Sequence, residues 1–238
     1  MNMSNPYKKE VFSMDSCVPK YKTRAVYIVL SQTQTKFGRC IRAIAKQRYN
    51  HASIALDSGL TQLYAFARPQ HCAVLQGRLV RESLERYTMG NGKPVPVTVY
   101  RVPVSEEEYQ WISGTIENMV DNPEYMYNLF SVLTYPIFKG FPVYHAFSCV
   151  EFIAYLLHAL GYLGEKPFCR YKPDDLLPIL KPLLVYQGDI RGCLHPSGAD
   201  RRYFAPLNGA VVLEGIQSLL RITKRSVFYR VTDPVVQA

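Results

Sequence analysis

The chain has 238 residues, of which 48% are hydrophobic and 20% are charged, and its formal net charge is +9. This length predicts one large domain or a domain with an appendage, and the composition is that of a globular protein rather than a disordered one. The longest apolar run, Val150 to Leu157, contains Glu151 and is too short to span a bilayer.

Targeting signals, metal sites and nucleic-acid motifs are not recognisable in the sequence. The charged first residues precede no apolar segment, so we expect no secretory signal and a cytoplasmic, reducing location. The six cysteines are scattered without a CxxC pair, which argues against disulfides, a zinc site or another metal, and we expect no cofactor. The basic residues form small clusters without a recognised nucleic-acid motif, so nucleic acid is not an expected partner.

The N-terminal part of the chain predicts a strand and a helix after a polar lead-in over residues 1–23. The run Ala25 to Leu30 is continuously β-branched or aromatic, which is typical of a buried strand. Residues 35–47 carry apolar side chains at helical spacing between basic ones, which predicts a helix.

A hairpin is predicted next. Residues 51–57 and 60–66 have the composition of strands, and Ser-Gly at 58–59 is a turn signal between them. A two-residue turn at this point places Ser53 opposite Tyr64.

Further elements are expected as the chain proceeds. Residues 67–93 look irregular, whereas Val95 to Val102 alternates around Pro96 and predicts a strand near a sheet edge. Ser105 and the acidic residues after it predict the start of a helix that ends near Val120.

The C-terminal half is expected to contain a long loop and three helical segments. Residues 122–147 are dense in Tyr, Phe and Pro and predict a loop, whereas residues 152–160 predict a helix that ends at Gly161. Residues 174–184 predict a weaker helix or turn. A late helix over 211–223 places most of its apolar residues on one side: Val212, Ile216, Leu219, Leu220 and Ile222.

The segment around Cys149 is the most informative one. Ser148 followed three residues later by Glu151 is a capping box, which places Cys149 at the first position of the helix. The backbone N–H groups and the positive end of the helix dipole favour a thiolate there. The ordinary alternative is a buried cysteine that acts as a small hydrophobic residue. A catalytic cysteine also needs a base within hydrogen-bond reach.

His51 is the best candidate for that base among the five histidines, because it begins a strand on a face of small residues. In the expected hairpin register Gln62 and Tyr64 share that face, so either side chain could orient the imidazole. A slip of one residue would instead present Leu63 and Ala65. The alternative for His51 is a structural histidine with satisfied hydrogen bonds.

These segments together resemble a known family. The strings YNHASIALD, LYAFARP and, much later, FSCVEFIAYLL look like the circularly permuted NlpC/P60 group of papain-like thiol hydrolases. In that group the histidine strand precedes the cysteine helix. The opening segment VYIVLSQTQTKFGRCIRAIAKQRYNHASIAL also resembles the first strand and helix of the family, and the resemblance covers about residues 24–185.

The resemblance implies an α+β papain-like fold, in which a small antiparallel sheet packs on the cysteine-bearing helix. It implies Cys149 as nucleophile and His51 as general base, with a third polar residue on the next strand. That strand offers Tyr64 or Gln62 instead of the His, Glu or Asn of relatives. Tyr127 is similar to a tyrosine that lines the site in relatives. Tyr127, Gln62 and Ser148 are therefore the candidate substrate-binding residues.

The implied activity is hydrolysis or acyl transfer at the carbonyl of a peptide, amide or ester. Relatives include peptidoglycan peptidases, amidases and acyltransferases of the lecithin:retinol type. Residues 24–185 would form the catalytic domain, and residues 186–238 an appendage packed on it that covers the site or binds a partner. Contact of the basic chain with a membrane surface is a further expectation.

Two other functional classes remain open. Papain-like folds can lose activity and keep their shape, so a catalytically inactive binding module is one alternative. The other is a cysteine phosphatase, because residues 71–78 match the pattern HCx₅R with Cys72 and Arg78. The loop interior Ala-Val-Leu-Gln is not glycine-rich and no buried strand precedes it, which argues against that chemistry.

Overall fold

A computed structural model describes residues 24–35, 38–39, 47–89, 93–193 and 200–228. The described chain is a mixed α+β structure. The expected lead-in over residues 1–23 and most of the helix expected over residues 35–47 lie outside the described residues.

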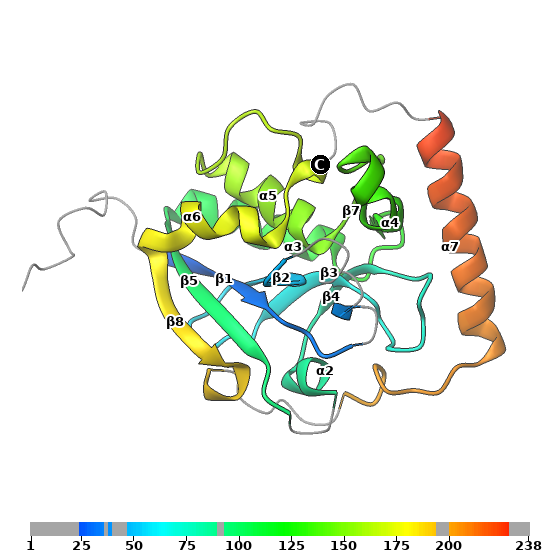
Figure 1. Ribbon diagram of the computed structural model, residues 1–238, viewed down its shortest axis with the longest axis horizontal. Coiled ribbons are helices and arrows are strands. Elements are labelled where there is room, and N and C mark those ends of the chain that lie inside the picture. Colours follow the sequence, from blue (N-terminus) through cyan, green and yellow to red (C-terminus); the bar gives the residue numbers. More distant parts are fainter. Residues whose placement is uncertain (1–23, 36–37, 40–46, 90–92, 194–199, 229–238) are drawn as a thin grey trace, which may run out of the picture.

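An antiparallel sheet of six strands forms the centre of the described structure, in the order β4-β3-β2-β1-β5-β8 (Figure 1). Its strands are β1 (Arg24–Ser31), β2 (His51–Ala55), β3 (Leu63–Ala67), β4 (Arg78–Arg81), β5 (Pro96–Val104) and β8 (Leu184–Asp189). A short parallel pair joins β6 (Met126–Tyr127) to β7 (Ala146–Phe147).

The helices surround this sheet. The described α-helices are α2 (Leu84–Thr88), α3 (Glu106–Met119), α4 (Leu129–Phe138), α5 (Cys149–Ala159), α6 (Leu177–Leu180) and α7 (Gly209–Phe228). Short 3-10 turns lie at Phe168–Arg170, Pro173–Leu176, Lys181–Leu183 and Ile190–Gly192.

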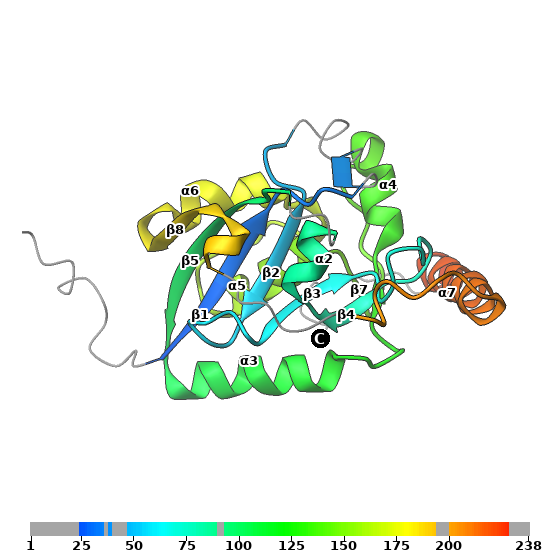
Figure 2. The same cartoon turned by 90° about the horizontal axis from the view of Figure 1, so that it is seen from below.

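Each face of the sheet buries its own core. On one face Ile28 and Ile54 pack with the apolar side of α5, which is buried along its first nine residues. On the other face Val29 and Leu63 pack against Tyr87 of α2. Figures 1 and 2 show α3, α5 and α6 on the first face and α2 on the second. The side-chain alternation of the strands thus produces a sheet that is covered on both faces.

Several predicted elements are confirmed. The strand over 25–30, the two hairpin strands and the helices over 105–120, 152–160 and 211–223 are all present as β1, β2, β3, α3, α5 and α7. Gly161, expected to follow the helix, has a positive φ of 77°. The prediction that β5 lies near an edge is confirmed, because only β8 lies beyond it in the sheet. Pro96 is tolerated since it is the first residue of the strand.

Two segments predicted to be irregular contain regular elements. Residues 67–93 include β4 and α2, and residues 122–147 include β6, α4 and β7. The strands β4, β6 and β7 are four residues or fewer and α2 is five, so they are too short to show a hydrophobic period.

The predicted hairpin register is wrong by one residue. Tyr64 lies opposite Ile54, and Leu63 opposite Ala55, instead of Tyr64 opposite Ser53. The connection is longer than the expected two-residue turn because the Asp57 carboxylate accepts the backbone N–H groups of residues 61 and 62 at 3.1 and 2.8 Å. Tyr64 and Gln62 therefore do not share the face of His51.

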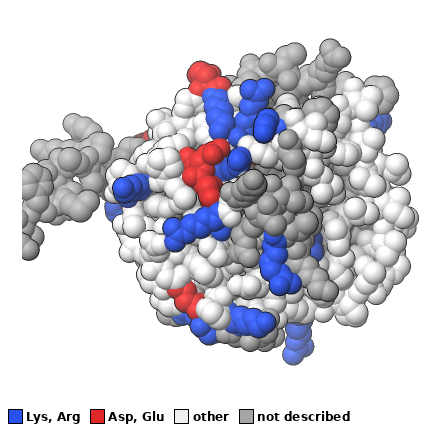
Figure 3. Space-filling view, in the orientation of Figure 1, with Lys and Arg blue, Asp and Glu red and all other residues white. Residues whose placement is uncertain are grey.

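The C-terminal segment adds a sheet strand and a helix to the fold. The expected boundary between residues 185 and 186 falls inside β8. In α7, Ile222 is buried and Leu219 partly buried, whereas three other apolar residues of the predicted helix are exposed: Val212, Ile216 and Leu220. The described helices include none with the length and apolar character needed to cross a membrane. Lysine and arginine side chains on the viewed face form small groups interspersed with acidic ones (Figure 3).

Candidate active site

The N-terminus of α5 holds Cys149 as the sequence predicts. Ser148 is the N-cap: its Oγ accepts the backbone N–H of Glu151 at 3.3 Å, and its own N–H donates to the Glu151 carboxylate. Cys149 follows at the first helical position and is 6% exposed. Helix geometry provides no intrahelical acceptor for the N–H of this position. The sulfur thus lies at the positive end of a rigid, buried helix.

The capping carboxylate is itself buried. Asn128 Nδ2 donates to Glu151 Oε1 at 3.1 Å, and Asn128 also caps α4 by accepting the N–H of Ser131. Burial raises the pKa of Glu151 to about 7, although hydrogen bonds from Ser148, Ser131 and Asn128 oppose the increase. One polar network therefore fixes the beginnings of both α4 and α5.

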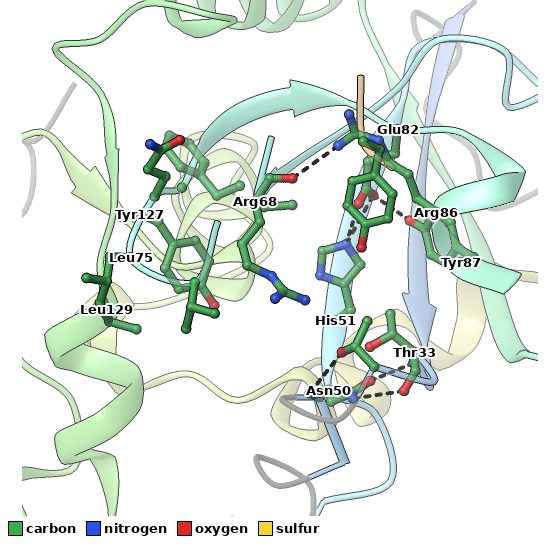
Figure 4. Close-up of a pocket in the computed structure, with 18 residues that line it drawn as sticks. Thr33, Asn50, His51, Arg68, Leu75, Glu82, Arg86, Tyr87, Tyr127 and Leu129 are labelled. Atoms are coloured by element: carbon green, nitrogen blue, oxygen red, sulfur yellow. Dashed lines mark hydrogen bonds and ion pairs between the residues drawn. The ribbon is translucent and has the colours of Figure 1, made fainter. Parts of the chain in front are cut away.

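His51 begins β2 and is bonded to Glu82, the residue that follows β4. Its Nε2 lies 2.9 and 3.0 Å from the two Glu82 carboxylate oxygens. Ser53 and Tyr87 donate their hydroxyls to Glu82 Oε2 at 2.7 and 2.5 Å. Figure 4 shows Glu82 beside His51 and Tyr87. The strand β3, which contains the small residue Ala65, lies between β2 and β4.

The electrostatics favour the charged form of this pair. Burial lowers the pKa of His51, but the negative charge of Glu82 and hydrogen bonds with Cys149 and Glu82 outweigh burial and raise the pKa to about 10. Burial raises the pKa of Glu82, but the His51 charge and hydrogen bonds from His51, Tyr87 and Ser53 lower it below its usual value. His51 is therefore an imidazolium at neutral pH, paired with a carboxylate.

Cys149 and Tyr127 complete the cluster. The Cys149 side chain hydrogen bonds with His51, and its charge also raises the His51 pKa. Burial, followed by the charge of Cys149, raises the pKa of Tyr127 well above its usual value. The Tyr127 phenol therefore stays protonated beside the sulfur and can donate a hydrogen bond.

Gly77 allows the close placement of Tyr127. The Tyr127 N–H donates to the Gly77 carbonyl at 2.7 Å. A Cβ at position 77 would lie 2.2 Å from the Tyr127 Cβ, so any other residue would displace the backbone or the tyrosine. The loop before β4, which is distant from Tyr127 in the sequence, thus positions the Tyr127 side chain in the site.

A pocket opens beside this cluster. It is lined by residues from the β2, β3 and β4 ends of the sheet, from α2 and from the loop before β4 (Figure 4). The polar lining residues include His51, Glu82, Tyr127, Arg68 and Arg86.

The structure brings together some of the predicted residues and separates others. Cys149, His51 and Tyr127 meet, as described above. Tyr64 packs against the core on the α5 side, and Gln62 is exposed in the hairpin loop, so neither orients His51. Ser148 is buried and its hydroxyl is used by the helix cap.

Glu82 takes the place beside His51 that was predicted for Tyr64 or Gln62, and no local pattern in the sequence pointed to it. It lies one strand further from His51 than expected, in a segment predicted to be irregular. The signal that could have identified it is the alternative hairpin register, shifted by one residue. That register puts the apolar residues Leu63 and Ala65 on the His51 face, so a polar partner of His51 must come from the strand after β3.

Several polar groups of the described residues 71–78, which carry the phosphatase-like pattern, are already hydrogen bonded or paired. The N–H groups of Ala73, Val74 and Gln76 donate to carbonyls within the loop. Arg78 belongs to β4, and its Nε lies 3.4 Å from an Asp121 carboxylate oxygen. Cys72 Sγ donates to the Ala205 carbonyl at 3.5 Å.

Two other described cysteines, Cys169 and Cys193, have raised pKa values. Burial raises the pKa of Cys169 to about 12 and that of Cys193 to about 11, so both are thiols at neutral pH. The described residues contain no group of three or more histidine, cysteine or acidic side chains arranged for a metal ion. Comparisons with protein-family models, with curated proteins and with solved structures found no match to this chain.

Proposed function

We propose that this protein is a thiol hydrolase or acyltransferase of the circularly permuted NlpC/P60, papain-like type, which acts on an amide or ester carbonyl. The observation that carries the proposal is the buried cluster of Cys149, His51 and Glu82, in which each side chain contacts the next. The order of elements also supports it, since the histidine strand β2 precedes the cysteine helix α5 and packs against it.

In this reaction the Cys149 thiolate attacks the substrate carbonyl carbon and forms an S–C bond. The His51 imidazolium gives its proton to the leaving amine or alkoxide as the C–N or C–O bond breaks, which leaves a thioester. Neutral His51 then takes a proton from water or an acceptor alcohol, whose oxygen attacks the thioester. Cys149 leaves as the thiolate, and the acid or new ester is released with His51 protonated again.

Glu82 and Tyr127 have distinct roles in the proposal. Glu82 fixes the imidazole orientation by bonding Nε2, so the other ring nitrogen is the one directed toward the sulfur. The backbone N–H of Cys149 and the protonated Tyr127 hydroxyl are the donors for the oxyanion of the tetrahedral intermediate.

The proposal is tested with p-nitrophenyl acetate, an activated ester that reports acylation directly. We expect a burst of p-nitrophenol and an acetyl group on the peptide that contains Cys149, detected by mass spectrometry. Cys149→Ser should abolish the thioester, whereas Cys72→Ser, at another described free thiol, should leave the burst intact.

Two outcomes would contradict the proposal. One is acetylation distributed equally over the cysteines, and the other is a burst that persists in Cys149→Ser. Either result, in a protein that retains its fold by circular dichroism, would favour the inactive binding module instead.

A further inference from the structure

The helix α7 lies at the edge of the described structure, on the side away from β8 (Figures 1 and 2). One side of α7 is fixed to the body of the protein. Val211 and Ile222 are buried on this side, and Arg225 donates to the Glu124 carbonyl at 2.6 Å. The Val211 carbonyl accepts a hydrogen bond from Gln76 at 2.7 Å, so α7 is held near both of its ends.

The opposite side of α7 carries an exposed apolar stripe. Its members follow one another in alternating steps of three and four residues: Leu213, Ile216, Leu220, Thr223 and Val227. The four apolar members are between 47% and 66% exposed. Such steps form the heptad repeat through which one helix packs against another. Thr223 interrupts the stripe, and residues 209–227 lack the aromatic side chains typical of helices that lie in a membrane surface.

This outer stripe is symmetric about the middle of α7. A second α7 can run antiparallel to the first, with residue 218 of both helices at the same level. The facing pairs are then Gly209–Val227, Leu213–Thr223 and Ile216–Leu220. The two helices overlap over their whole length, and a two-fold axis makes each contact occur twice. The outer stripe therefore fits a second copy of itself.

The charges beside the outer stripe fit the same arrangement. Glu214 and Lys224 are exposed on one side of the stripe, and neither has an interaction within the described residues. In the antiparallel pair, Lys224 of one copy and Glu214 of the other lie on the same side, about 3 Å apart along the axis by the helical rise. Two ion pairs can form across the pair of helices. A parallel pair would instead place the two Lys224 side chains at one level.

We propose that the outer stripe of α7 binds a second copy of this chain, with the two α7 helices antiparallel across a two-fold axis. The removal of exposed apolar side chains from water drives the association. A single pair of helices makes a small interface, so the dimer should dissociate on dilution. The inference is independent of the proposed function, because the residues of the stripe do not belong to the Cys149 cluster.

Sedimentation velocity over a wide range of protein concentration tests the proposal. The wild type should change from monomer to dimer as the concentration rises. Leu220→Glu places two unpaired charges near the centre of the interface and should raise the dissociation constant by about a hundredfold or more. Val185→Glu is the matched control and should leave the constant unchanged, because Val185 is 54% exposed on β8, far from α7. In dilute protein, where the monomer predominates, Leu220→Glu should retain the wild-type free energy of unfolding.

An exchange of charges tests the antiparallel arrangement. Glu214→Lys and Lys224→Glu each place like charges opposite one another, so each should weaken its own dimer by about three- to tenfold. An equimolar mixture of these two variants brings opposite charges together again and should associate as tightly as the wild type. A mixture that associates as weakly as the separate variants would overturn the antiparallel arrangement.

Several results would overturn the proposed dimer. One is a wild-type chain that stays monomeric at every concentration, and another is a dimer that Leu220→Glu leaves unchanged. Loss of the dimer in Val185→Glu alone would place the interface at the edge strand β8. A monomer that binds vesicles of phosphatidylcholine and phosphatidylserine, and loses this binding in Leu220→Glu, would show that the stripe contacts a membrane surface instead of a second copy.

Discussion

Replacement of Glu82 by Gln tests the buried ion pair most severely. The substitution keeps the size of the side chain but removes the negative charge opposite His51. It also leaves the hydroxyls of Ser53 and Tyr87 with a neutral acceptor. Breaking a buried pair by removing one partner typically costs about 3 to 5 kcal/mol. The rise of the His51 pKa from 6.5 to about 10, to which the Glu82 charge contributes, has the direction that such a cost requires.

The cost should depend on pH in a defined direction. The His51 pKa is raised in the folded protein. The contribution of His51 to the free energy of unfolding is therefore complete below pH 6.5 and is lost as the pH rises through about 10. The Glu82 pKa is lowered in the folded protein. The contribution of Glu82 to the free energy of unfolding is therefore present above pH 4.5 and is lost as the pH falls below that value. The destabilisation by Glu82→Gln is therefore largest between about pH 4.5 and 6.5 and becomes smaller toward pH 9.

Urea unfolding followed by circular dichroism at pH 6 and pH 9 measures this effect. Glu165→Gln, at an exposed position, is the matched control and should change the unfolding free energy by less than about 0.5 kcal/mol at either pH. A Glu82→Gln protein that is as stable as the wild type at pH 6, or whose deficit grows toward pH 9, would refute the buried ion pair.

Other substitutions give expected outcomes that unfolding and acylation assays check. Gly77→Ala should destabilise the protein by about 1 to 3 kcal/mol and slow acylation of Cys149, because the added Cβ meets Tyr127; an unchanged burst would show that this contact is unimportant. Ser148→Ala should cost about 1 kcal/mol through loss of the helix cap, and no change in unfolding would argue against that cap. Ile222→Ala should cost about 2 to 4 kcal/mol, whereas Leu220→Ala, at a residue 65% exposed in the same helix, should cost less than about 0.5; equal costs would contradict the packing of α7.

The sequence predicted those parts of the fold that depend on local signals. The capping box is a local signal, because Ser148 and Glu151 lie within one stretch of four residues. It specifies where α5 begins, so the position of Cys149 could be predicted. The continuous apolar run of β1 identifies a buried strand for the same reason.

The remaining parts depend on contacts between distant segments. The hairpin register is set by the Asp57 side chain, which closes a longer loop than the Ser-Gly signal indicates. Glu82 reaches His51 from a strand of four residues, whose pairing is fixed by the sheet and not by its own pattern. The orienting carboxylate could therefore not be identified before the strand order was known.

The central claim is that His51 activates Cys149, and the rate of Cys149 alkylation by iodoacetamide as a function of pH tests it most directly. We expect the rate in the wild type at pH 7 to exceed that in His51→Gln by about tenfold or more, because a neighbouring imidazolium favours the attacking thiolate. Two identical profiles would contradict the account.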